Sequence, residues 1–137
     1  MDINSLKSQF SKYKKDLLDL NKYMYENPEL GYQEIKSVNK ITKLIKKHTA
    51  DAKFKKFTDI PTAFTASINN KSRKKNIAIC IEYDALPNVG HACGHNLISS
   101  IGLGAFFILS NYINDLDYEI KSVSYKHLRA HETSNHL

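Results

Sequence analysis

The sequence predicts an α/β domain in which helices pack on the faces of a β-sheet. Two amphipathic helical segments open the chain, four strand-like segments follow, and a third helical segment precedes the last strand. This order of elements is typical of a sheet that is covered by helices. With 137 residues, of which 42% are hydrophobic, the chain is long enough for one domain with a buried core.

The first two segments carry helical periodicity. Apolar residues recur every three or four positions from residue 5 to residue 25, which places them on one face of a helix. They are Leu6, Phe10, Tyr13, Leu17, Leu20 and Met24. Asn27 ends this helix because a residue that precedes proline avoids the helical conformation. A second helix is expected over residues 33–48, with apolar positions at Ile35, Val38, Ile41 and Ile45.

The pattern then changes to the alternation that is typical of strands. Residues 53–57 predict a weak strand, and their lysines indicate a sheet edge. Residues 63–68 predict a second strand. Residues 76–81 predict the strongest one, because apolar residues on both of its faces indicate the interior of a covered sheet. A third helix over residues 97–112 is apolar almost all round, so we expect it to be buried, and a strand follows at 117–123.

Composition excludes several classes of protein. The net charge of +6 arises from lysines that are spread along helices, and the one dense cluster, at residues 71–75, is expected to form a turn, so we expect no nucleic-acid partner. No apolar run reaches the roughly 18 residues that a membrane span needs. The start of the chain lacks a secretory signal, and two cysteines cannot form a disulfide scaffold. A cytoplasmic protein is expected, with Cys80 packed in the core among isoleucines.

Chemically reactive side chains gather between residues 82 and 96. This loop follows a strand at its carboxyl end, where open α/β sheets bind ligands. Cys93 and His95 together suit zinc, and Asp84 could hold the second nitrogen of a histidine or reach toward the ion. By spacing alone a metal site and a chance pairing are equally favoured. Cys93 could also be a nucleophile with His91 or His95 as its base.

Two motifs in the chain resemble the M20 family of metallopeptidases and amidohydrolases. The run Glu82 to Ile98 is similar to the metal-binding segment of the family, through Asp84 to Pro87 and Gly90 to Asn96. Upstream, Asn27 to Glu34 is similar to its N-terminal signature. The likeness is closest to the branch of amino-acid-conjugate amidohydrolases, near p-aminobenzoyl-glutamate hydrolase and the β-alanyl dipeptidase-like members. It covers residues from about 10 to 121, which is about the first third of a full-length member.

The resemblance implies an incomplete, truncated catalytic domain of the zinc-exopeptidase-like α/β type. In this domain a mixed sheet is flanked by helices. The resemblance assigns Cys93 and His95 as ligands of a two-metal centre, zinc or manganese, and Asp84 as the catalytic residue that orients the site. Glu82 stands where other branches have a metal-binding histidine, and His91 is part of the motif without being assigned as a ligand. The implied activity is hydrolysis of an amide bond, in an N-acyl amino acid, an amino-acid conjugate or a dipeptide, by a metal-activated water.

The chain departs from the family after its last predicted strand. Family members show a Gly-x-Pro-Ala-Glu-Glu-like segment there, which supplies the general-base glutamate, whereas this chain reads Ser122 to His127. We therefore expect residues 1–123 to be the N-terminal part of an M20-type catalytic domain and residues 124–137 to be a non-native or disordered tail. The helical spacing of His127 and His131 within this tail is not taken as a metal site.

On this interpretation the 137-residue chain is inactive alone, since two ligands cannot hold a dinuclear centre. The expected partner is a small amide or dipeptide substrate, and no membrane association is expected. The parent protein is expected to be a homodimer that forms through a domain missing from this chain. The alternatives are a thiol hydrolase that depends on Cys93 and a basic binding module without catalysis.

Overall fold

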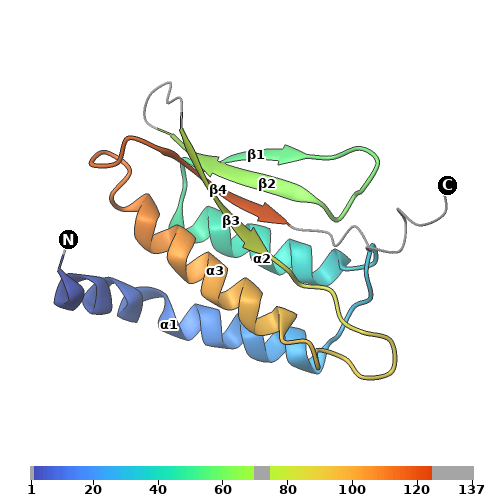
Figure 1. The fold of residues 1–137 in the computed structure, drawn as a ribbon. Coiled ribbons are helices and arrows are strands. Elements are labelled where there is room, and N and C mark those ends of the chain that lie inside the picture. The colour runs from blue at the N-terminus through green and yellow to red at the C-terminus, as the bar shows by residue number, and fades with distance from the viewer. Residues whose placement is uncertain (1, 70–74, 125–137) are drawn as a thin grey trace, which may run out of the picture.

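The structure is a computed structural model that describes residues 2–69 and 75–124 (Figure 1). Its elements follow the predicted order. They are α1 (Ile3–Glu26), α2 (Ile35–His48), β1 (Lys53–Lys56), β2 (Phe64–Ile68), β3 (Asn76–Ile81), α3 (His95–Ser110) and β4 (Glu119–Ser124). The expected turn at residues 71–75 falls mostly outside the described residues, as does the expected tail with His127 and His131. Ser124 itself is the last residue of β4, one position beyond the predicted domain boundary.

The four strands form one mixed sheet in the order β1-β2-β4-β3. β1 pairs with β2 and β2 with β4 in antiparallel fashion, whereas β3 and β4 are parallel. Because parallel neighbours need a crossover connection, the chain passes from β3 through α3 to reach β4. The mixed α/β class is therefore confirmed.

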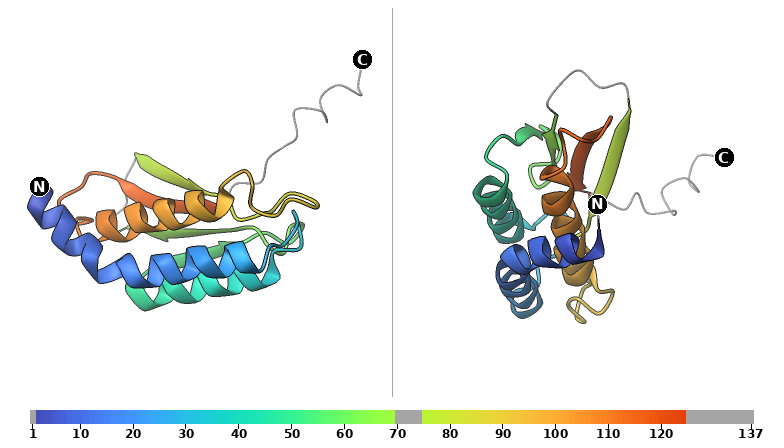
Figure 2. Two further views of the ribbon diagram at one scale, coloured as in Figure 1. Left: turned by 90° about the horizontal axis from the view of Figure 1, so that it is seen from below. Right: turned by 90° about the vertical axis from the view of Figure 1, so that its left-hand side faces the viewer.

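All three helices lie on the same side of the sheet (Figure 2). α3 approaches β3 closely at Gly102, where an added Cβ would lie 2.9 Å from a methyl carbon of Ile81 and 3.2 Å from the Cys80 carbonyl oxygen. Only glycine allows this approach without a shift of the strand or the helix. α1 packs in turn against α3, so that the helices form a layer two deep beneath the strands.

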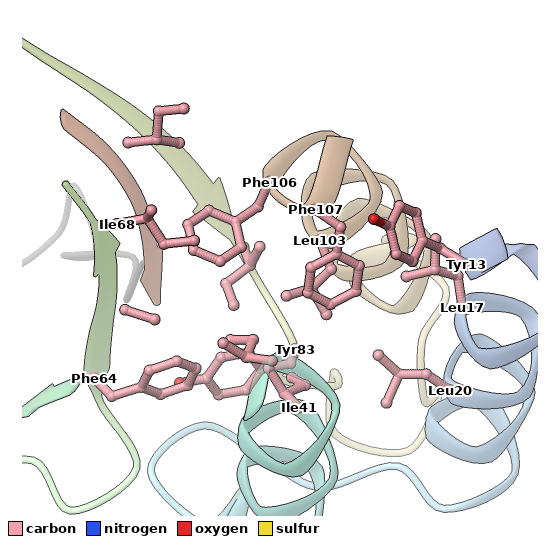
Figure 3. Close-up of a cluster of buried hydrophobic side chains, with 14 of the residues drawn as sticks. Tyr13, Leu17, Leu20, Ile41, Phe64, Ile68, Tyr83, Leu103, Phe106 and Phe107 are labelled. Atoms are coloured by element: carbon pink, nitrogen blue, oxygen red, sulfur yellow. The ribbon is translucent and has the colours of Figure 1, made fainter. Parts of the chain in front are cut away.

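The core lies between the sheet and this helical layer (Figure 3). It is made of alternate residues of the strands and of one stripe from each helix. The buried side chains include Tyr13, Leu17, Leu20, Ile41, Phe64, Ile68, Tyr83, Leu103, Phe106 and Phe107. The stripes predicted for the first two helices therefore contribute their central residues to the core, whereas the outer positions Phe10 and Ile35 are exposed.

Two predictions about burial are wrong. β3 is an edge strand in the described part of the sheet, and alternate residues, including Cys80, are exposed on the face that carries no helix. The prediction that Cys80 packs in the core is therefore wrong. Apolar residues on both faces of a strand do not ensure that another element covers each face. α3 is likewise only partly buried, and Ile101 keeps 71% of its surface exposed. The prediction that the strand near residue 53 lies at an edge is confirmed by β1.

The helices in the described part of the chain are too short or too polar to cross a lipid bilayer.

Candidate functional site

The loop between β3 and α3 begins at the carboxyl end of β3 and carries the predicted site residues. Strand alternation continues for four residues beyond β3, to Ala85, because Ile81, Tyr83 and Ala85 are buried while Glu82 and Asp84 are partly exposed. Glu82 and Asp84 therefore point to the same side of the chain. The backbone of the loop returns to the helical layer at Gly94, which precedes α3.

His95 is the first residue of α3 and lies between the two carboxylates. Its Nδ1 atom is 2.9 Å from Asp84 Oδ1 and 3.0 Å from the Asp84 carbonyl oxygen. Its Nε2 atom is 2.7 Å from Glu82 Oε2. Gly94 makes this possible, since its φ of 78° lies in the left-handed region that favours glycine and turns the chain sharply into the helix. An imidazole held by two acidic groups is a common arrangement around metal ligands and proton-transfer residues.

Tyr83 anchors the strand end beneath this pair. Its side chain is only 2% exposed, and its hydroxyl donates a hydrogen bond to the Thr62 carbonyl oxygen. Burial raises the pKa of Tyr83 well above its ordinary value, so this side chain stays neutral and acts as a fixed hydrogen-bond donor. With Tyr83 fixed in the core, Glu82 and Asp84 are held toward His95.

The two sequence motifs meet in space. Ala85 N donates a hydrogen bond of 2.8 Å to the Glu29 carbonyl oxygen, and Leu30 and Ala85 form an isolated parallel bridge. The Glu29 carboxylate in turn accepts hydrogen bonds from the backbone N–H groups of Lys36, at 3.0 Å, and Ser37, at 2.7 Å. Glu29 thus connects the start of α2 to the residue after Asp84. Sequence reasoning quoted Glu29 only as part of a motif and gave no sign of this role.

Neither Cys93 nor His91 contributes to the hydrogen-bonded group that His95 forms with Asp84 and Glu82. Cys93 is exposed, and the described residues contain no group of three or more histidine, cysteine or acidic side chains that could hold a metal ion. His91 is only 6% exposed, and neither ring nitrogen has a hydrogen-bond partner among the residues that the structure describes. Burial lowers the pKa of His91 and favours its neutral form. The dyad that would use His91 as the base for Cys93 is therefore not formed.

Among curated proteins the chain is similar to peptidases and deacetylases, although no family model matches it. It is 34% identical over 93 residues to the Xaa-Arg dipeptidase of Mus musculus, and the aligned region covers 63% of this chain and 22% of the relative. It is 29% identical over 103 residues to the N-acetyldiaminopimelate deacetylase of Oenococcus oeni, with 64% and 27% covered. The chain thus spans about a quarter of the length of these curated relatives.

Solved structures agree with the fold. A dinuclear metal-binding peptidase of the M20 family from Bacillus subtilis superimposes with a TM-score of 0.71 at 22% identity, over 86% of this chain and 35% of the peptidase. This chain has the fold of the matched part of that M20 peptidase. A protein of methicillin-resistant Staphylococcus aureus, described as an aminohydrolase, gives a TM-score of 0.74 at 20% identity, with 88% and 34% covered. The resemblance to the M20 family that the motifs indicated is supported by sequence relatives and by fold.

Proposed function

We propose that this chain is the N-terminal part of a metal-dependent M20 amidohydrolase or peptidase, from the branch of amino-acid-conjugate amidohydrolases. The whole enzyme would hydrolyse an amide bond in an N-acyl amino acid, an amino-acid conjugate or a dipeptide. The observation that carries the proposal is the imidazole of His95, which lies between Asp84 and Glu82 at the carboxyl end of β3. Relatives that are dipeptidases and deacetylases support amide hydrolysis as the reaction class.

The contacts of His95 fit a metal ligand. Each ring nitrogen of His95 lies beside a carboxylate, Nδ1 at Asp84 and Nε2 at Glu82, and negative charge there favours a bound cation. His95 and Cys93 would be the ligands of a zinc or manganese ion. Asp84 would keep the ring oriented through Nδ1, as carboxylates next to metal-bound histidines do. A bound metal pair supplies a water of lowered pKa and polarises the scissile carbonyl group.

We further propose that the 137-residue chain has no hydrolase activity alone. Both carboxylates near His95 are engaged by its ring nitrogens, which leaves neither as a base for the attacking water. The described part of the chain contains no group of three or more histidine, cysteine or acidic side chains that could hold a metal ion. The remaining ligands, the general base and the subunit interface of the parent enzyme would lie in the part of its relatives that this chain does not match.

Cobalt(II) binding tests the metal assignment. Cobalt replaces zinc at many sites and gives a thiolate charge-transfer absorption band when a cysteine sulfur is bound. We expect the band in the natural chain and its loss in Cys93→Ser and His95→Gln. Cys80→Ser is the matched control, because Cys80 is the second exposed cysteine and lies outside the loop. A band that survives in Cys93→Ser, or disappears in Cys80→Ser, would contradict the assignment. N-acetylated amino acids should remain uncleaved by the chain with or without added metal.

A further inference from the structure

A groove of about 260 Å³ lies between α2 and the strand β1. One wall is a face of α2 between Val38 and Lys46, and the other includes Phe54 and Lys56 of β1. Phe64, at the start of β2, also lines it. Figure 2 shows α2 and β1 on the same flank of the molecule. None of the lining residues belongs to the loop between β3 and α3, so the groove is separate from the site described above.

The groove gathers positive charge. Lys43 and Lys46 of α2 and Lys56 of β1 line it, all three are exposed, and its lining residues include no aspartate or glutamate. Within residues 2–69 and 75–124, the ion pairs formed by lysine involve other lysines than these. Like charges around one hollow repel one another, and a bound anion relieves that repulsion.

Another side of α2 carries lysines whose charge is compensated. A second groove, between α1 and α2, is lined by lysines but also by Asp16 and Asp19. Lys47 forms an ion pair of 2.6 Å with Asp16 there. Lys43 borders both grooves, whereas Lys46 borders only the one beside β1. The uncompensated charge therefore belongs to the groove beside β1, and Lys46 and Lys56 define it.

The same groove offers an aromatic surface. The Phe54 side chain is partly exposed, and Lys46 Nζ lies 5.5 Å from the centre of its ring. Behind it, the buried ring of Phe64 lies 6.2 Å from the Phe54 ring, measured between their centres. A ligand ring that packs against Phe54 removes apolar surface from water and brings a charged substituent close to the Lys46 ammonium. Both side chains are accessible to such a ligand from solvent.

The size and the charge of the groove select the ligand. Its volume of about 260 Å³ is slightly below the roughly 300–1,000 Å³ of typical small-molecule sites, which suits a ligand of one or two rings. A phosphate monoester carries about 1.5 to 2 negative charges at pH 7, whereas a carboxylate carries one. Lysine binds phosphate as a point charge. Because several lysines and no acidic group line the groove, the more highly charged group is favoured.

We propose that this groove binds a phosphate monoester of an aromatic group, with the phosphate near Lys46 and Lys56 and the ring against Phe54. It is a second ligand site of the chain. Binding there requires neither a metal ion nor hydrolysis, so the site is independent of the proposed amidohydrolase.

Nuclear magnetic resonance titration of the 137-residue chain tests this site, in buffer free of metal ions and phosphate. The probes are 2-naphthyl phosphate, 2-naphthoate, 2-naphthol and inorganic phosphate, which separate the contribution of the head group from that of the ring. We expect 2-naphthyl phosphate to shift the amide signals of Phe54 and Lys56 in a saturable manner. It should bind about tenfold more tightly than 2-naphthol or inorganic phosphate and about threefold more tightly than 2-naphthoate.

Lysine variants locate the site. Lys46→Met and Lys56→Met should each weaken 2-naphthyl phosphate about threefold to fivefold, which is the scale of one exposed charge contact. Both side chains are exposed, so neither change disturbs the core. Lys14→Met is the matched control, because it removes an exposed lysine of α1 that lines neither groove, and it should leave the affinity unchanged.

Four results would overturn the proposal. The first is the absence of saturable shifts, or shifts confined to residues outside the groove. The second is equal affinity for 2-naphthyl phosphate and 2-naphthol, and the third is equal affinity for 2-naphthyl phosphate and either 2-naphthoate or inorganic phosphate. The fourth is an equal loss of affinity in Lys14→Met and Lys46→Met, which would mean attraction to the net charge of the chain. Cobalt binding through Cys93 is measured separately, so either proposal can fail without the other.

Discussion

At the scale of single residues, the site depends on the backbone around His95 as much as on its carboxylate partners. Gly94 adopts a left-handed conformation directly before α3, with nothing within 4 Å of an added Cβ. A substitution there meets no steric obstacle, so its cost reports the conformation alone. The interpretation of residues 82–96 as a site anticipated that an aspartate would hold a histidine nitrogen, which Asp84 does. The contact of Glu82 with His95 Nε2 was not anticipated. Such a contact depends on how the end of β3 is placed against the start of α3, which the spacing of residues in the sequence does not reveal.

Gly94→Ala should lower the free energy of unfolding by about 1–2 kcal/mol, the usual cost of a left-handed conformation for an L-residue. Gly31→Ala is the control, since Gly31 also has nothing within 4 Å of an added Cβ but lacks a positive φ. Urea denaturation followed by circular dichroism measures both variants. Equal effects in the two would show that the turn at Gly94 is not strained by a side chain.

At the scale of elements, periodicity predicts helices and strands well because each pattern is set within its own segment. The strand at residues 76–81 was predicted with its observed bounds. Burial was predicted less well, because a face is covered only when another element lies on it. Cys80 and Ile101 are apolar or small, yet both are exposed on faces that no described element covers. The role of Glu29 was missed for a related reason, since Glu29 lies between the helices and its partners are seven and eight residues away in α2.

Glu29→Gln should destabilise the start of α2 by about 1 kcal/mol, which is typical for loss of a charged cap at a helix N-terminus. Because Glu29 also contacts Ala85 through its backbone, we expect the amide signals of residues 84–86 to shift in the same variant. Glu26→Gln, an exposed change at the end of α1, is the control. Destabilisation without any change in the amide signals of residues 84–86 would show that the Glu29 side chain stabilises α2 without influencing the loop.

At the scale of the whole molecule, one carboxylate joins the two N-terminal helices. Asp16 on α1 accepts hydrogen bonds from Lys47 Nζ at 2.6 Å and contacts His48 Nε2 at 2.7 Å, both at the end of α2. The hydrogen bond from Lys47 lowers the pKa of Asp16 below its ordinary value of 3.8. Because the folded-state pKa is the lower one, the stabilisation is present above pH 3.8 and is lost as the pH falls through the folded-state pKa.

Asp16→Asn should therefore cost about 1 kcal/mol or less at pH 7, given that Lys47 is largely exposed and screened by solvent. The difference between the variant and the natural chain should shrink as the pH is lowered below 3.8. Urea denaturation at pH 7 and at pH 3 measures it. A difference that stays constant across this range would mean that the charge of Asp16 is not what joins the helices.

The two edges of the sheet differ in charge. β1 carries Lys53, Lys55 and Lys56 among its four residues, whereas β3 has no charged residue from Asn76 to Ile81. Lysines along an edge discourage the addition of another strand, and a neutral edge permits it. Additional strands can therefore extend the sheet past β3 more readily than past β1. A fused partner or tag is better tolerated beside β1, where the lysines discourage strand pairing.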